Sequence, residues 1–341
     1  VDDYQDLLRV SVASAGNDHR LGANEAPPAI VSVFLGSELT AILEAVEKDA
    51  EYNANAVSIM QLNGNVIPHF AKDTTDRNRT SPFAFTGNKF EFRMPGSSFS
   101  ISGPNIVLNT IVAEVLEQFA DELESQKYKE AAIKKLIRET VAAHKRIIFN
   151  GDGYTDEWVE EAEMRGLLNL KSTPEAIPYM LDKKNIELFT KHRIFTEAEI
   201  HSRVEILLEG YAKTIRIEAL TLGEMMTKDL LPAASAFSSD LAATIANKKL
   251  AGLEAEGTYE LAALKRISTL SSALCESLKK LEKALAAADE ISGAKEIACH
   301  YRDAVFAAMQ EIRETADKIE PLLSEKYLPY PTYGQLLFGV N

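Results

Sequence analysis

The sequence predicts an α+β protein in which short antiparallel strands and helices are followed by a mainly α-helical region of long antiparallel helices. The first 104 residues are rich in Gly, Pro, Asn, Ser and Thr and contain only short apolar runs. From Pro104 onward the apolar residues recur at spacings of three and four. Because 341 residues exceed what one hydrophobic core usually organises, we expect two domains, at residues 1–125 and 126–341.

The composition is that of an ordinary globular protein, with 46% hydrophobic and 26% charged residues. A formal net charge of −14 argues against general binding of nucleic acid or of an anionic membrane, whose phosphates would meet like charge. No apolar run reaches membrane-spanning length and no secretory signal is seen, so we expect a cytoplasmic protein. Cys275 and Cys299 are expected to be buried free thiols in a reducing compartment.

Residues 89–94 alternate with period two, which predicts a strand with two different faces. Phe90 and Phe92 would share one face, and Lys89, Glu91 and Arg93 the other. The charged face is therefore the one expected to meet a ligand. Upstream, residues 27–47 read as an apolar run followed by a short helix.

Four helices are predicted from apolar stripes, the first starting with Pro104 at its first helical position. The last two series fit an antiparallel pair of long helices, packed within a bundle or, alternatively, as a coiled coil between subunits. The four stripes are Ile106, Leu108, Ile111, Val112, Val115, Leu116 and Phe119; Val204, Leu207, Leu208, Tyr211, Ile215, Ala219 and Leu222; Leu264, Ile267, Leu270, Leu274, Leu278, Leu281 and Leu285; and Ile297, Tyr301, Val305, Ala308, Ile312 and Ile319.

The segment "NGDGYTDEWVEE", residues 150–161, has acidic residues at several positions of a calcium-binding loop. However, Tyr154 replaces one ligand and Thr155 stands where the sharp turn of such a loop needs Gly. A plain turn before a helix is the preferred interpretation.

Two other stretches carry chemistry. "GNDHRLGANEAPPAI" places Arg20 and Glu25 across a Gly-bearing loop, which could act as a lid that delivers a carboxylate to a site. "RNRTSPFAFTGNKFEFR" gathers four cations around the single acid Glu91, and its guanidiniums suit carboxylate or phosphate oxygens. Taken singly, either stretch could be ordinary charge-paired surface.

Together, the two stretches resemble the glutamine synthetase family. In that family an R-L-x(n)-EAP flap is followed by N-R-[ST] and then by an [IF]-E-x-R-x-P strand, and residues 20–27, 78–80 and 90–95 match these in order. Three segments are similar to sequences of the type III branch: "GANEAPPAI", "TSPFAFTGNKFEFRMPGSSFSISGPN" and "YPTYGQLLFGV". The resemblance runs from about Tyr4 to the C-terminus, and it implies that 1–125 is the last part of the catalytic domain.

The resemblance implies ATP-dependent ligation of ammonia to glutamate through a γ-glutamyl phosphate, with Mg²⁺ or Mn²⁺ as the metal. It also implies a homo-oligomer with active sites at subunit interfaces. Arg20 should bind the glutamate carboxylate, and Glu25 should close the site and take a proton from ammonia. Arg93 should contact glutamate or the phosphoryl intermediate.

The resemblance assigns the remaining residues to the phosphates. Arg79 should stabilise the transferring phosphoryl group and contact the nucleotide, and Glu91 should ligate the metal that bridges the phosphates. Lys89 occupies a position where better-known branches carry Arg beside the nucleotide. These roles agree with the chemistry, because phosphoryl transfer depends mainly on positioning and charge neutralisation.

The chain also departs from the family pattern. The interval from Arg79 to Glu91 is shorter than in the type I pattern, and the Arg that usually follows N-R-S is absent, with residues 83–85 reading Phe-Ala-Phe. The family's other metal-binding glutamates lie before the flap, and Val1 is not an initiator Met. We therefore expect a fragment or processed chain without ligase activity of its own. The rival hypothesis is a helical oligomerisation or scaffold module with a non-catalytic synthetase remnant.

Overall fold

The computed structural model describes residues 1–341 except 23–25, 53–58, 61–69, 72–79, 255 and 340–341. The chain divides into two compact units, unit 1 (Val1–Leu207) and unit 2 (Leu208–Asn341). The expected division into domains at residue 125 falls within unit 1 and stays a prediction.

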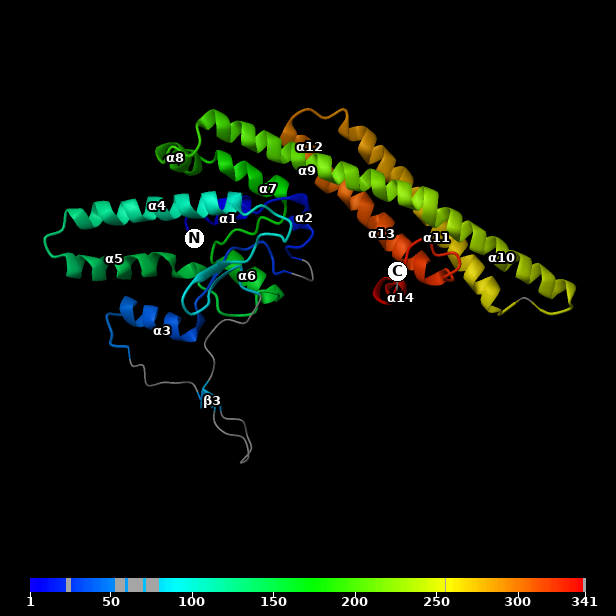
Figure 1. The fold of residues 1–341 in the computed structure, drawn as a ribbon, viewed down its shortest axis with the longest axis horizontal. Coiled ribbons are helices and arrows are strands. Elements are labelled where there is room, and N and C mark those ends of the chain that lie inside the picture. The colour runs from blue at the N-terminus through cyan, green and yellow to red at the C-terminus, as the bar shows by residue number, and fades with distance from the viewer. Residues whose placement is uncertain (23–25, 53–58, 61–69, 72–79, 255, 340–341) are drawn as a thin grey trace. The chain divides into compact units, whose positions relative to one another are not determined.

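Unit 1 combines short strands with helices of very different length (Figure 1). Its elements are α1 (Gln5–Val10), α2 (Ala15–Asp18), β1 (Val33–Phe34), α3 (Gly36–Glu47), β2 (Ile59–Met60), β3 (Phe70–Ala71), β4 (Phe83–Phe85), β5 (Phe90–Phe92), α4 (Ser102–Glu124), α5 (Lys129–His144), the 3₁₀ helix η1 (Lys145–Ile147), α6 (Asp156–Met164), α7 (Thr173–Ala176), the 3₁₀ helix η2 (Ile177–Leu181), α8 (Lys183–Lys191) and the start of α9 (Glu197–Met225).

The main sheet has the strand order β1-β4-β5. β4 and β5 form an antiparallel hairpin with Phe83 opposite Phe92, which confirms the strand predicted over 89–94. β1 pairs with β4 in parallel, so the sheet is mixed and the expected antiparallel pairing holds for β4 with β5 but not for β1 with β4. The parallel pair arises because the chain leaves β1 through α3 before it returns to β4. β2 and β3 form a separate antiparallel pair.

A cluster of buried apolar residues lies behind this sheet and holds it against α6. Trp158 on α6 is 3% exposed and stacks on Phe149 with ring centroids 3.7 Å apart. Phe83 and Phe85 of β4 pack against the same cluster. Burying aromatic side chains of this size is among the largest favourable contributions in a core. The sheet edge that carries the charged residues therefore rests on a firm base.

The turn at residues 150–155 is confirmed as a turn before a helix. Asn150 Oδ1 accepts hydrogen bonds from the backbone N–H groups of Leu35 and Gly36, at 3.1 and 3.0 Å, at the start of α3. Thr155 caps α6 by accepting from the backbone N–H of Trp158 at 3.3 Å. Asn150 therefore caps the start of α3.

α4 lies beside α5 in unit 1 and also contacts α1 and α8 (Figure 1). It begins at Ser102, so Pro104 is its third residue rather than its first. The expected apolar stripe is only partly buried, since Val112 and Leu116 are 52% and 61% exposed. The packed face includes Val107, Ile111 and Glu114, and Glu114 contacts Lys191 at the end of α8 and the adjoining His192.

Glu114 makes the strongest ionic contact of this helix. Its carboxylate accepts hydrogen bonds from Lys191 Nζ at 2.8 and 3.0 Å and lies 2.7 Å from His192 Nε2. These contacts, with Lys191 contributing most, lower the pKa of Glu114 to about 2. A carboxylate with so low a pKa stabilises the fold through its charged form.

Unit 2 is helical over its described residues. It contains the remainder of α9, the π-helix η3 (Met226–Leu230), α10 (Leu231–Leu250), α11 (Tyr259–Ala288), α12 (Ala294–His300), the π-helix η4 (Tyr301–Phe306), α13 (Ala307–Ile319), the 3₁₀ helix η5 (Glu320–Leu322) and α14 (Tyr333–Phe338).

The antiparallel helix pair predicted for the C-terminal region is confirmed in unit 2. α11 packs on α13, with Leu274 of α11 and Val305 and Ile312 of the facing segment fully buried. His300 Nε2 lies 2.8 Å from the carbonyl oxygen of Ala284, and Lys280 reaches Glu311 at 2.6 Å. As the residue number rises from 280 to 284 in α11, the number of the contacting residue falls from 311 to 300 in the facing segment. The two helices therefore run antiparallel.

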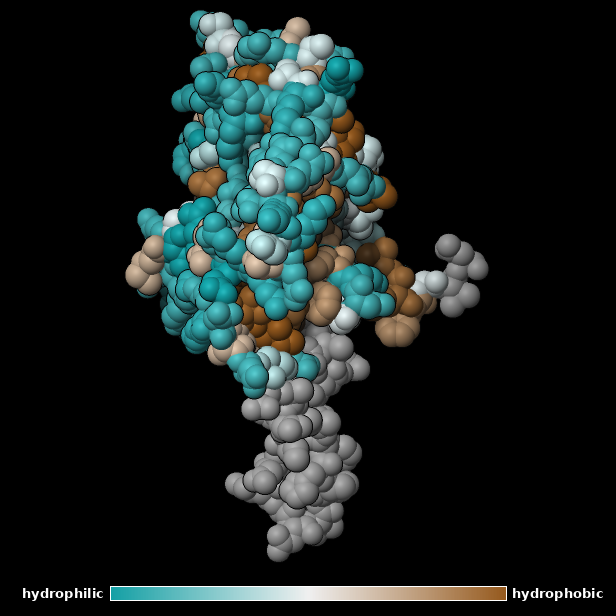
Figure 2. Space-filling view, turned by 90° about the vertical axis from the view of Figure 1, so that its left-hand side faces the viewer, coloured by the Kyte–Doolittle hydropathy of each residue, from teal (hydrophilic) through white to brown (hydrophobic). Residues whose placement is uncertain are grey.

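Polar residues dominate the surface drawn in Figure 2, where hydrophobic residues show as separate patches. Neither cysteine is fully buried, contrary to expectation: Cys275 is exposed, because it follows the core residue Leu274 onto the outer side of α11, and Cys299 is half-buried. Both are free thiols. No helix in the described ranges is both long and apolar enough to cross a membrane.

The Glu114 contact predicts a pH-dependent stability difference. Glu114→Gln should lower the free energy of unfolding at pH 7 by about 1–3 kcal/mol, since it removes a charge-assisted contact. The native pKa lies below the ordinary value of 4.5, so the stabilisation is complete above pH 4.5 and is lost as the pH falls toward about 2. Urea unfolding followed between pH 7 and pH 3 measures the difference from the unsubstituted protein.

The matched control is Glu122→Gln on the same helix, where the side chain is exposed. It should change stability by less than about 0.5 kcal/mol at every pH. A Glu114→Gln variant as stable as this control at pH 7 would contradict the role given to the contact.

Candidate functional site

The charged face of β5 is occupied by one acid and two bases. Glu91 Oε1 lies 3.1 Å from Lys89 Nζ, and Glu91 Oε2 lies 3.0 Å from Arg93 Nη2. Hydrogen bonds from Lys89 and then from Arg93 lower the pKa of Glu91 from its ordinary value. The alternation read from the sequence therefore does place all three side chains together.

Arg20 is fixed in a hydrogen-bond network around the buried amide of Asn17. Arg20 Nε donates to Asn17 Oδ1 at 3.0 Å, and Arg20 Nη2 donates to the carbonyl oxygen of Met94. Asn17 Nδ2 donates to the carbonyl oxygens of Val12 and Met94, at 2.8 and 3.1 Å. The guanidinium is thereby tied to the segment that directly follows Arg93.

Arg20 and Arg93, which are 73 positions apart in the sequence, line one small cavity of about 40 Å³. Pro27, Pro28 and Pro82 form part of its wall. The backbone N–H of Arg93 donates to the carbonyl oxygen of Pro82 at 2.8 Å, which holds the strand end against this wall. Two arginines that line one cavity favour an anionic ligand with planar oxygen pairs.

Arg20 also borders a larger open hollow of about 500 Å³. Its lining also includes Ser14, Asn17, His19 and the loop at residues 96–99. This surface is rich in hydroxyl and amide groups, so it suits a polar ligand better than an apolar one.

Glu25 lies outside the described residues, but both ends of its loop are placed. Leu21 pairs with Ala26, and the backbone N–H of Gly22 donates to the carbonyl oxygen of Pro27 at 2.9 Å. Gly22 has φ +77°, a conformation that favours glycine. The loop thus starts and ends beside the cavity that Arg20 and Arg93 line.

Arg77 and Arg79 also lie outside the described residues. Directly after Arg79, Thr80 and Ser81 are 7% and 4% exposed. Ser81 lines the same cavity as Arg20 and Arg93. Four of the six predicted site residues are therefore described, and Arg20, Lys89, Glu91 and Arg93 lie on the two segments that meet at Met94.

Gly153 is a contributor to the site that sequence reasoning missed. A Cβ at this position would lie 2.8 Å from the carbonyl oxygen of Thr80 and 3.3 Å from Cβ of Pro27. Only glycine lets the 150–155 turn approach so closely to the segments that follow Arg79 and Glu25. Gly151 and Gly153 in the sequence indicated a tight turn, but the sequence does not show which other segment the turn approaches.

Glu91 is the right kind of ligand for Mg²⁺ or Mn²⁺, which prefer carboxylate oxygens. It belongs to neither of the two groups of three potential metal ligands in the described part of the chain, Asp2–Asp3–His144 and Glu114–Glu117–His192. One carboxylate fits as one ligand of such an ion, and a complete site needs further oxygen ligands.

Comparison with known proteins identifies relatives over the whole chain. Residues 132–249 match the family model for the glutamine synthetase C-terminal domain. A glutamine synthetase of Butyrivibrio fibrisolvens is 47% identical over 349 aligned residues, which cover 100% of this chain and 49% of that protein.

Two further relatives have the same extent. The type-3 glutamine synthetase of Dictyostelium discoideum is 40% identical over 99% of this chain and 47% of its own length. A glutamine synthetase of Bacteroides fragilis (strain YCH46) is 38% identical over 98% of this chain and 47% of its own length. The chain thus spans about half the length of these curated relatives. The resemblance drawn from the flap and strand motifs is confirmed: the chain is similar to glutamine synthetases over nearly its whole length, and part of it matches the family's C-terminal domain.

Proposed function

We propose that the protein containing this chain is an ATP-dependent glutamate–ammonia ligase of the type III branch, forming glutamine through a γ-glutamyl phosphate. The observation that carries the proposal is the meeting of Arg20 and Arg93 at one cavity beside the base of the flap. A helical scaffold would not require two guanidiniums from distant segments to border the same cavity. The names of the three relatives support the same reaction.

In this proposal the two arginines bind the anionic substrate. Arg20, held at Asn17 and Met94, receives a carboxylate of glutamate, and Arg93 receives glutamate or the phosphoryl intermediate. Because Arg93 is paired with Glu91 in this structure, an incoming anion must compete with that carboxylate for the guanidinium. Competition of this kind favours a dianionic, bidentate ligand over a monovalent one.

Glu25 closes the site and takes a proton from ammonia as it attacks the γ-glutamyl phosphate. The tied ends of the loop, Leu21 with Ala26, would let residues 22–25 act as a short lid. Excluding water matters here because an acyl phosphate hydrolyses readily. Arg79, which directly precedes the buried Thr80, stabilises the transferring phosphoryl group.

Glu91 supplies one carboxylate to the divalent cation, Mg²⁺ or Mn²⁺, and Lys89 lies beside the nucleotide. When bound, such a cation neutralises phosphate charge during transfer. Hydrogen bonds from Lys89 and Arg93 lower the pKa of Glu91, and its carboxylate is ionised at neutral pH. The other ligands, and a neighbouring subunit that completes the site in a homo-oligomer, belong to the same proposal.

The roles of the two acids are tested by alanine substitution in the full-length protein. Glu25→Ala and Glu91→Ala should each lower glutamine synthesis by at least about 100-fold, which is typical for loss of a catalytic base or a metal ligand. Size-exclusion chromatography should show unchanged assembly. The control, Glu122→Ala, should keep full turnover, and full turnover in both test variants would refute the assignment.

Gly153 provides a second test. Gly153→Ala should push the Thr80 and Pro27 segments apart and lower kcat/KM for glutamine synthesis by about tenfold or more, because small displacements at a site are costly. The matched control is Gly210→Ala in α9, where an added Cβ meets nothing within 4 Å. That variant should be fully active and slightly more stable. Equal activity of the two variants would contradict a positioning role for Gly153.

A further inference from the structure

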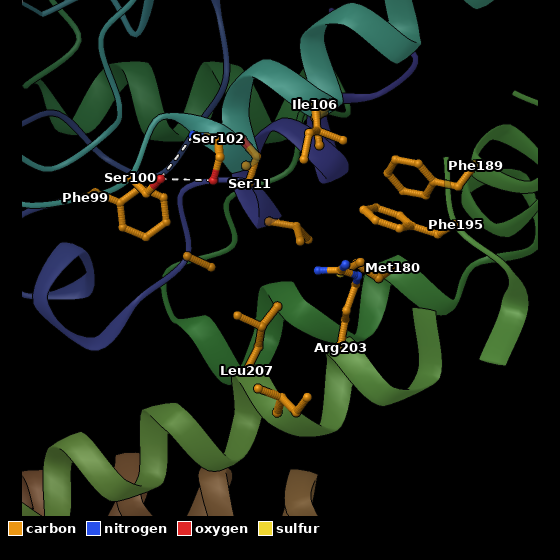
Figure 3. A pocket seen from close by; sticks show the side chains of 15 residues that line it. Ser11, Phe99, Ser100, Ser102, Ile106, Met180, Phe189, Phe195, Arg203 and Leu207 are labelled. Carbon is orange, nitrogen blue, oxygen red and sulfur yellow. Dashed lines mark hydrogen bonds between the residues drawn. The ribbon is translucent and has the colours of Figure 1, made fainter. Parts of the chain in front are cut away.

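A separate pocket, of about 310 Å³, opens in unit 1 between α1, α4, η2, α8 and the first turns of α9 (Figure 3). None of the residues predicted for glutamine synthesis lines it. Its size lies at the lower end of the range of about 300–1,000 Å³ that is usual for small-molecule sites. The pocket therefore suits a ligand with one ring rather than a nucleotide.

The walls are mainly apolar; the side formed by α1, η2 and α8 is buried, whereas Arg203, Ile206 and Leu207 on α9 are exposed. Val10, Val107, Met180 and Phe189 line the pocket although each is at most 7% exposed overall, so their positions are set by the core behind them. Phe189 and Phe195 have ring centroids 5.3 Å apart at an interplanar angle of 55°. Such a tilted aromatic pair offers ring faces and edges to a third ring.

One cation reaches into this apolar space. Arg203 extends from α9 beside Met180, and its guanidinium carbon lies 4.1 Å from the ring centroid of Phe195 (Figure 3). Its guanidinium forms no hydrogen bond or ion pair with the residues that the structure describes. The donors of a guanidinium stacked on an aromatic ring point outward along its edge, where a carboxylate binds best.

The absence of an ion pair at Arg203 has a local cause. The acid one helical turn earlier is Glu199, the ordinary i,i+4 partner. Its Oε2 instead accepts from the backbone N–H and the hydroxyl of Thr196, at 2.8 and 2.9 Å, at the start of α9. The helix start thus holds this acid in hydrogen bonds, so Glu199 acts on Arg203 only through its charge, an interaction that also helps to lower the pKa of Glu199 after the larger effect of Thr196.

We propose that this pocket binds a small aromatic monocarboxylate, with the ring against Phe189 and Phe195 and the carboxylate on Arg203. No Asp or Glu occurs among the described residues that line the pocket, so the ammonium of an amino acid would be desolvated without an acidic partner. A purely apolar ligand would bury the guanidinium edge unpaired. Ser100 and Ser102, whose hydroxyl oxygens are 2.9 Å apart, form a polar rim at another side of the pocket.

The test measures binding of the probe 3-phenylpropionate to the full-length protein by titration calorimetry. We expect saturable binding that weakens about tenfold or more in Arg203→Gln, which corresponds to about 1.4 kcal/mol. Arg203→Lys should retain part of the affinity, since it keeps the charge but loses the bidentate edge. Phenethylamine, which has the ring but a cation, should not bind.

The matched control is Arg266→Gln, which removes an exposed arginine that does not line the pocket and should leave the affinity unchanged. Circular dichroism should show the same helix content in both variants. Four results would overturn the proposal: no saturable binding up to about 10 mM, equal binding of phenethylamine, equal affinity in the Arg203→Gln and Arg266→Gln variants, or binding abolished by Arg93→Gln but not by Arg203→Gln. The last result would place the probe at the glutamine-synthesis site instead.

Discussion

The candidate site depends on one buried side-chain amide, that of Asn17. Asn17 is 3% exposed, and burial requires each of its polar groups to find a partner. Its two donors go to Val12 and Met94, and its oxygen receives Arg20. One side chain thereby joins the segment after α1, the start of the flap and the end of the strand that carries Glu91 and Arg93. The contact with Met94 brings together segments that are 77 positions apart in the sequence.

The neighbouring residue, Asp18, secures Asn17 from the other side. Arg9, only 1% exposed, donates to Asp18 Oδ1 at 2.8 Å and to the carbonyl oxygen of Leu170 at 2.8 Å. The backbone N–H of Thr173, at the start of α7, donates to Asp18 Oδ2 at 2.5 Å. Burial raises the pKa of Asp18 although Arg9 opposes the shift. α2 is thus held between a buried ion pair and the Asn17 amide, which explains how a four-residue helix can fix the position of Arg20, the arginine proposed to bind substrate.

The sequence predicted the local parts of this arrangement well. The period-two alternation around Glu91 and the apolar stripe of α11 were sufficient, because both depend on nearest neighbours along one element. The role of Asn17 and the close approach of Gly153 to Thr80 could not be predicted, because each depends on which distant segment lies opposite.

The wrong expectations for α4 and for the sheet also concern contacts between segments that are distant in the sequence. The apolar stripe of α4 predicted that Val112 and Leu116 would be packed. The packed face instead includes Glu114, a buried acid that contacts Lys191 and His192. The parallel pairing of β1 with β4 likewise depends on where the chain re-enters the sheet after α3, β2 and β3.

The most direct test of this account is a double-mutant cycle between Asn17 and Arg20 in the full-length protein, read as kcat/KM for glutamate. If Asn17 acts by holding Arg20, then Asn17→Ala and Arg20→Gln remove the same interaction with substrate. The double variant should then be no more than about twofold worse than Arg20→Gln alone. Effects that simply multiply would show that the two residues act independently, and the account of the site would be contradicted.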